Sequence, residues 1–382
     1  MHVDGVSPPP WSPAWAPPAP PPSRARGTFS VALPPVTPVP PPPRSRRALG
    51  PLRPPQLLCW QLAVVAVMAV LDRPWPVFTA VVVAASAVVV LTAVRRRGRW
   101  LWEWAALGLA FLRRSLHREP GHPEPGRALI ELLVPGATGV ETDLGDEQVF
   151  LVSAAPGVTA VLRPSARRDL TKAVPSPEAL LPDTGEEFAV RFVHHAGTDR
   201  SRPPRVWVAL QALRTVEAHH EDDVRRALGN AVRRVRRKLR RDGVEVHALG
   251  AAETVATVSA LAHLTGGRTR VREQWRLWWS GPVAQAAFRL AGWDRLPPSV
   301  APQLLRWLLT AVPQAAVTVS VTARTGQGTE AVVRVAAADP RALDGAAHQV
   351  ARLAKERGIV LERLDGRHRD GLAATLPLGV TR

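Results

Sequence analysis

The chain has 382 residues, 50 basic and 32 acidic side chains, a formal net charge of +18 and one cysteine, Cys59. One cysteine excludes an internal disulfide and a cysteine-based zinc site. Strong positive charge is typical of nucleic-acid-binding proteins. Here it gathers in the N-terminal tail, in a short segment near residue 100 and in one predicted helix, so we expect no nucleic-acid partner.

Residues 1–55 hold 19 of the 39 prolines. This stretch has no apolar periodicity, so we predict a disordered cytosolic tail with polyproline II character. Such a tail serves as a tether or as a ligand for a proline-binding module. We favour the tether, because inert tails of this kind are common.

Two uncharged apolar runs follow, over 57–71 and 77–94, with a five-residue connector between them. The second run has the length of a membrane span, and the first is short for one. The short connector forces an antiparallel arrangement, so we predict a two-helix transmembrane hairpin over 56–94. A buried helical hairpin in a soluble core is the less favoured alternative. The short first span also predicts contact with neighbouring helices.

Basic residues flank the outer ends of both runs, which predicts cytoplasmic N- and C-termini in a two-span protein of the cytoplasmic (inner) membrane. The residues that carry this orientation are Arg53, Arg95, Arg96, Arg97 and Arg99. Tryptophans at the predicted borders suit the membrane interface. They are Trp60, Trp75, Trp100, Trp102 and Trp104.

Residues 95–127 read as a basic juxtamembrane collar with an interfacial helix over 100–116 and a linker. Residues 128–382 predict a cytosolic α/β (α+β) domain with a mixed β-sheet and packed helices. We expect strands at 148–154, 158–163, 189–194, 205–210, 244–249, 271–279, 286–290, 317–325, 329–337 and 359–364. We expect helices at 221–242, 253–264, 300–310 and 340–357. Two segments, ending at 240–250 and 355–366, share a strand-strand-helix-strand order. This shared order reflects either a weak internal repeat or convergence on the turn residues common in α/β proteins.

The helix that begins near Glu221 is strongly basic. Nine positive charges and no acid lie between Arg225 and Arg241. The plain interpretation is a solvated helix whose arginine stems cover apolar surface. The number of cations exceeds what solubility needs, so we favour docking on an acidic partner or anionic lipid. The candidate docking residues are Arg225, Arg226, Arg233, Arg236, Arg237 and Arg240.

Motifs of catalysis are missing from the sequence, including the phosphate loop, the dinucleotide fingerprint, H-E-x-x-H and G-x-S-x-G. His194-His195 and the run from His219 to Asp223 contain metal-type ligands. Adjacent histidines rarely point at one ion, and acids suit the start of a helix. We therefore predict no catalytic residues, no cofactor and no metal site.

Three stretches carry a resemblance to a known family. They are the Pro-Pro-Gln-Leu start of the first apolar run, the exit VRRRGRWLWEWAALGLAFLRR and the ending LDGRHRDGLAATLPLG. From about Pro54 onward the chain resembles EccE, a membrane component of the type VII (ESX) secretion system of actinobacteria. The long proline-rich tail departs from that family's pattern.

The resemblance implies a non-catalytic structural subunit of a hetero-oligomeric inner-membrane complex with EccB, EccC and EccD, in which EccC is the ATPase. The alternative is a membrane-tethered enzyme of nucleotide-sugar type, because α/β domains often host such sites. The absence of a phosphate loop and of an acid pair at a motif spacing favours the structural subunit.

Overall fold

The structure is a computed structural model that describes residues 54–96, 99–113, 117–118, 124–143, 147–165, 175–182, 185–199, 201–265 and 270–380. The proline-rich tail predicted over 1–55 therefore falls almost entirely outside the described residues, as do Arg53 and Arg97.

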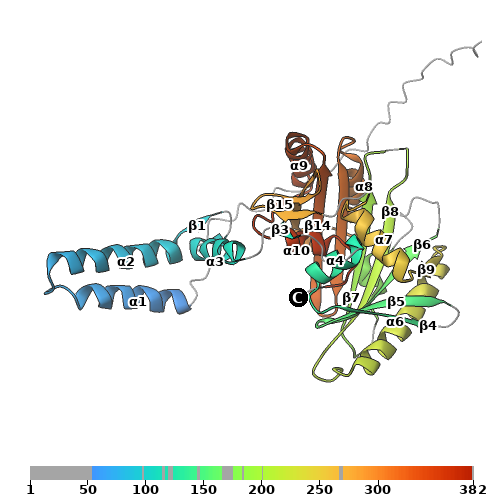
Figure 1. Cartoon of the computed structure of the whole chain (residues 1–382), viewed down its shortest axis with the longest axis horizontal. Coiled ribbons are helices and arrows are strands. Elements are labelled where there is room, and N and C mark those ends of the chain that lie inside the picture. Colours follow the sequence, from blue (N-terminus) through green and yellow to red (C-terminus); the bar gives the residue numbers. More distant parts are fainter. Residues whose placement is uncertain are drawn as a thin grey trace, which may run out of the picture. The chain divides into compact units, whose positions relative to one another are not determined.

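Two apolar helices come first, α1 (Pro54–Met68) and α2 (Trp75–Ala93) (Figure 1). They contact each other at Thr92, where Gln56 Nε2 donates to the backbone carbonyl at 3.1 Å and Trp60 Nε1 donates to the hydroxyl at 2.8 Å. Of the described helices, only α2 is long and apolar enough to cross a membrane, with 19 residues and a mean hydropathy of 2.3. None of its residues is buried, so much of its apolar surface is exposed.

A short ribbon of β1 (Arg95–Arg96) and β2 (Arg99–Trp100) leads into α3 (Leu101–Leu112). A helix therefore lies where the interfacial helix was predicted, and it ends at Leu112, four residues earlier than expected. The ring of Phe111 meets Trp275 of the following domain edge-on at 5.3 Å. This face of α3 is thus covered by protein.

The domain contains a long antiparallel sheet with helices on both faces (Figure 1). Its first elements are α4 (Pro125–Leu133), β4 (Thr138–Asp143), β5 (Gln148–Ala154), β6 (Gly157–Pro164), η1 (Pro177–Leu180), β7 (Phe188–Ala196), β8 (Arg205–Leu213), α6 (Glu221–Arg241), β9 (Val246–Ala248) and α7 (Ala251–Leu261). Its later elements are β10 (Val271–Glu273), β11 (Trp278–Ser280), β12 (Val283–Ala291), η2 (Trp293–Arg295), α8 (Ala301–Thr310), β13 (Ala316–Arg324), β14 (Gln327–Ala337), α9 (Pro340–Lys355), β15 (Val360–Arg363) and α10 (His368–Ala374).

The strand order is β3-β10-β11-β12-β14-β13-β7-β8-β6-β5-β4, where β3 is His117–Arg118, and β15 and β9 pair with β12 and β6. The prediction of a mixed sheet was wrong, because every strand pairing of the described residues is antiparallel. The chain leaves β8 through helix α6 and then enters β9, which runs parallel to β8. Strand β6 lies between β8 and β9, however, so no parallel pair forms. Strands β14 and β15, which helix α9 joins and β12 separates, repeat this split β-α-β arrangement.

The domain thus consists of two halves with the same topology. The first half runs from β4 to α7 and the second from β10 to α10. In each, three strands precede a hairpin, a helix crosses over, and the last strand pairs with the third. The halves join where β7 pairs with β13. The two similar segments in the sequence are the central parts of these halves.

Apolar side chains cover both faces of the sheet, because neighbours along a strand point to opposite sides. Helices α4, α7 and α10 cover one face, where a single core cluster includes Trp207 of the first half and Trp278 of the second. Helices α6, α8 and α9 cover the other face. There the core is divided into two clusters, one under α6 and one under α8 and α9.

Two buried arginines connect the halves. Arg191 on β7 donates from Nη1 to the carbonyls of Ala373 and Leu376 at the end of α10, at 3.1 and 3.2 Å. Arg334 on β14 donates from Nη2 to the carbonyl of Leu261 at the end of α7, at 2.7 Å. Each half therefore caps a helix of the other half, at the end where the helix dipole favours a cation. Burial lowers the pKa of Arg191 to about 10 and that of Arg334 to about 9, so both stay charged at neutral pH.

Candidate docking surface on helix α6

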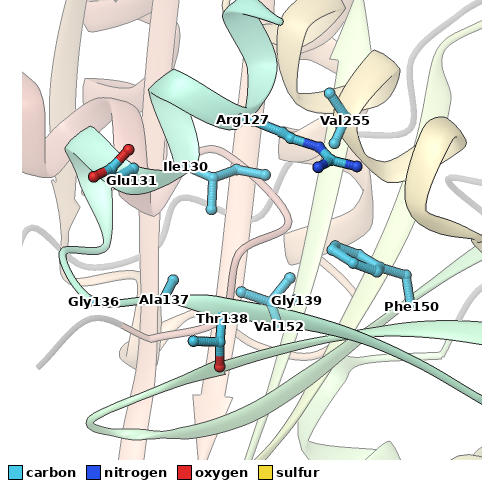
Figure 2. A pocket seen from close by; sticks show the side chains of 10 residues that line it. All are labelled: Arg127, Ile130, Glu131, Gly136, Ala137, Thr138, Gly139, Phe150, Val152 and Val255. Carbon is cyan, nitrogen blue, oxygen red and sulfur yellow. The ribbon is translucent and has the colours of Figure 1, made fainter. Parts of the chain in front are cut away.

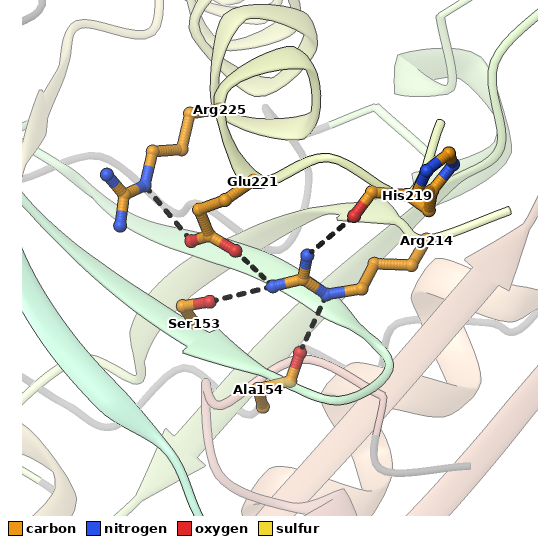
Figure 3. A network of polar contacts seen from close by, with 6 residues as sticks. All are labelled: Ser153, Ala154, Arg214, His219, Glu221 and Arg225. Atoms are coloured by element: carbon orange, nitrogen blue, oxygen red, sulfur yellow. Dashed lines mark hydrogen bonds and ion pairs between the residues drawn. The ribbon is translucent and has the colours of Figure 1, made fainter. Parts of the chain in front are cut away.

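Helix α6 is fixed at its N-terminal end by a polar network around Arg214 (Figure 3). The Arg214 guanidinium donates to the Ala154 carbonyl at 3.3 Å, to Ser153 Oγ at 3.0 Å and to the His219 carbonyl at 3.3 Å. It also pairs with the carboxylate of Glu221, the first residue of the helix. The start of α6 is therefore tied to the β5–β6 turn.

Glu221, in the acidic start of the helix, is engaged in this network. Partial burial raises the pKa of its carboxyl, but hydrogen bonds from Arg214 and Ser153 and the charges of Arg214 and Arg225 outweigh this effect, so the pKa is lowered. The ring centroids of His219 and His220 lie 4.0 Å apart, with the rings tilted by 39°. Among the described residues, no group of three or more His, Cys, Asp or Glu side chains could hold a metal ion.

One side of α6 packs on the sheet through residues spaced three and four apart, the pattern of an amphipathic helix. They are Val224, Leu228, Val232, Val235 and Leu239, each 2% exposed or less.

The predicted docking residues divide into two groups. Arg225 pairs with Glu221 at 3.0 Å, Arg236 with Glu147 at 2.8 Å and Arg226 with Asp223 at 3.3 Å. Within the described residues, Arg233, Arg237 and Arg240 are exposed and form no ion pair; Arg233 only donates to the Asn230 amide at 2.8 Å.

Two further exposed arginines, Arg234 and Arg241, extend this second group. Their spacing on the helix could have identified them. We call Arg233, Arg234, Arg237, Arg240 and Arg241 the arginine ridge.

The ridge is electrostatically unfavourable for the isolated chain. Like charges three or four residues apart on a helix destabilise it by about 0.2–0.5 kcal/mol per pair. The favourable effect of a helix C-terminus on cations is confined to the last turn, so it does not reach Arg233 or Arg234. The ridge is therefore suited to an acidic surface that neutralises it.

The residues predicted to orient and border the membrane segment lie in different surroundings. Arg95 stacks over the Trp100 ring at 4.7 Å, while Arg96 and Arg99 lie in β1 and β2. Trp75 and Trp102 are exposed, by 74% and 39%. The other three predicted interface tryptophans contact protein: Trp60 bonds to Thr92, Trp100 is buried, and Trp104 lies 6.2 Å from Trp275.

A cleft of about 320 Å³ lies between α4, β4, β5 and α7 (Figure 2). Its lining is mainly apolar, with Ile130, Phe150 and Val255 among the contributors. Arg127 pairs with Glu124 at 2.9 Å, and Glu131 points away from the centre of the cleft (Figure 2). The cleft thus contains no pair of acids aimed at a common point.

A comparison with protein families identifies part of this domain. Residues 204–290 match the family described as "Putative type VII ESX secretion system translocon, EccE". The chain carries an EccE-family domain. The matched segment runs from the start of β8 into β12, so it contains α6 and the whole arginine ridge. The stretches on which the sequence resemblance rests, near the apolar runs and at the C-terminus, lie outside it.

A search of curated proteins found no match for this chain. The family match to EccE indicates that the chain is a component of the type VII secretion translocon.

Proposed function

We propose that the chain is a non-catalytic structural subunit of the inner-membrane type VII secretion complex. Helices α1 and α2 form its two-span anchor, and the α/β domain lies in the cytosol with both termini. The partners are the other membrane subunits, EccB, EccC and EccD.

The observation that carries this proposal is the arginine ridge inside the segment that matches EccE. A surface of five exposed arginines without carboxylate partners among the described residues is unfavourable alone and becomes favourable against an acidic protein surface. The ridge is held in place by the packed side of α6 and by the network around Arg214. These features suit a rigid docking element and need no reacting group.

The anchor supports the same proposal. The exposed apolar surface of α2 needs lipid or other helices around it. Helix α1 has 15 residues and so spans about 22 Å, which is short of a hydrocarbon core of ~30 Å. A short helix of this kind is better accommodated by neighbouring spans than by lipid alone.

The test is purification of the full chain in a mild detergent, followed by mass spectrometry of the proteins that come with it. We expect EccB, EccC and EccD in fixed ratios. A chain that purifies alone at every detergent concentration would contradict the proposal. A nucleotide sugar that raises the melting temperature would favour the enzyme alternative instead.

The two-span orientation has a separate test. In a Cys59→Ser background, the new thiol of Asp72→Cys in the connector should react with a membrane-impermeant maleimide in intact cells. The new thiol of Arg352→Cys in the domain should react only after lysis. Equal reaction of both would contradict the proposed orientation.

A further inference from the structure

The sheet face that carries α6, α8 and α9 has a groove of about 740 Å³ where the two halves meet. Phe192 and His194 of β7 and Val321 of β13 line it, together with Trp293 and the start of α8. The two core clusters of this face stop on either side of it. The volume lies in the range of pockets that bind ligands.

The groove contains a buried polar atom without a partner. His194 is 4% exposed, and its Nδ1 has no hydrogen-bond partner in the described part of the chain. Burial lowers the pKa of His194 to about 4, so the ring is neutral at pH 7. An unpaired buried nitrogen reduces stability. Because protein encloses this nitrogen, an occupant contacts the exposed lining and rim of the groove instead.

The charge at the mouth of the groove is opposite to that of the chain. Glu178 and Asp294 are the charged residues among those that line it, and both are exposed. The Thr329 hydroxyl donates to the Glu178 carboxylate, which fixes this acid at the rim. Among the described lining residues the only charges are these two acids, which favour a positively charged occupant in a chain of net charge +18.

We propose that this groove binds an extended segment of a partner protein that combines an apolar side chain with a lysine or arginine. The apolar side chain packs against the accessible apolar lining at Leu296, Pro298 and Pro302. The basic group of the segment lies between Glu178 and Asp294. This proposal does not rest on the arginine ridge, which requires a partner surface of the opposite charge.

The experiment is a selection of random heptapeptides on phage, using the full chain in lipid nanodiscs. Peptides that also bind an Ala301→Phe variant, whose new ring obstructs the groove, are removed. We expect the remaining peptides to combine an apolar residue with Lys or Arg. Synthetic copies with Glu in place of the basic residue should bind at least about tenfold more weakly in fluorescence polarisation.

Charge exchange at the rim provides the decisive control. Asp294→Lys changes an exposed side chain, so the fold should persist, and it should shift the preference from the Arg peptide to the Glu peptide. Arg237→Glu on the ridge should leave the binding of the Arg peptide unchanged. A selection without groove-dependent peptides, or peptides that bind Asp294→Lys as well as they bind the wild type, would overturn the proposal.

Discussion

Helices α6 and α9 hold equivalent places in the two halves of the domain, yet their exposed sides differ. Both follow a hairpin, pack on the same face of the sheet and lead into a strand that pairs with the third strand of their half. Helix α6 carries nine basic and three acidic residues, whereas α9 carries three basic residues and one acidic residue. Because α9 packs on the sheet with only three basic residues, the fold does not require the additional arginines of α6. We therefore propose an external partner for them.

The halves also share features that the fold does require, and the largest predicted effect concerns the two buried arginines. Arg334→Leu leaves the Leu261 carbonyl and the Gln285 side-chain oxygen without a donor. Arg191→Leu removes a charged donor from two carbonyls at the end of α10, those of Ala373 and Leu376, which keep only their backbone donors. Each change should lower the free energy of unfolding by about 2–4 kcal/mol, measured by urea titration in detergent. The exposed Arg240→Leu should change it by less than about 0.5 kcal/mol. Equal effects of all three would refute the capping role.

Two glycines test the close approach of helices in each half. A Cβ at Gly126 of α4 would lie 2.5 Å from the backbone oxygen of Val255 in α7, and one at Gly371 of α10 would lie 2.3 Å from Ala287 Cβ. Gly126→Ala and Gly371→Ala should each destabilise the fold by about 1–3 kcal/mol, seen as a lower melting temperature.

Gly345 of α9, which has open space around it, is the matched control. Gly345→Ala should stabilise the fold slightly, since alanine is the better helix former. A loss of stability at Gly345 as large as at Gly126 would show that helix packing is not the cause.

A smaller effect comes from one buried histidine in each half. Burial lowers the pKa of His194 to about 4, and burial together with the Arg363 charge lowers that of His368 to about 3. Because the unfolded chain takes up these protons near pH 6.5, stability is full above that pH and falls as the pH drops toward the folded pKa values.

Between pH 7 and 5.5, each histidine should cost about 1 kcal/mol of the free energy of unfolding. His194→Leu should remove one such increment from the pH dependence. The removal is judged by the slope of stability against pH, whatever the variant does to stability at pH 7. An unchanged slope would mean that His194 is not held neutral.

The sequence predicted most elements of the domain because their apolar patterns are regular, as along α6 and over the hairpin of β13 and β14. It missed α4, whose first residues fell at the end of the predicted linker, and β4, a largely exposed edge strand with little apolar content. It also merged β10 and β11, since the tryptophans around Gln274 read as one strand. Pairing partners are long-range, so the antiparallel order was not accessible.

The candidate site was predicted in part. Charge counting located α6, but it could not tell the paired arginines from the exposed ones. Arg225 pairs with Glu221 at the start of the helix and Arg236 with the distant Glu147, whereas Arg237 and Arg240 form no ion pair with the described residues. The caps by Arg191 and Arg334 gave no signal either, because their acceptors are backbone carbonyls of helices distant in sequence.

The most direct test of the central claim reverses charge on the two equivalent helices. One variant carries Arg233→Glu, Arg237→Glu and Arg240→Glu on α6. The other carries Arg341→Glu, Arg352→Glu and Lys355→Glu on α9, the same change in charge at exposed positions. Native gels with mass spectrometry of the detergent extract measure assembly, and thermal unfolding confirms the fold. We predict that the α6 variant loses most of its co-purifying secretion subunits while the α9 variant keeps them. Equal assembly of both variants would contradict the account.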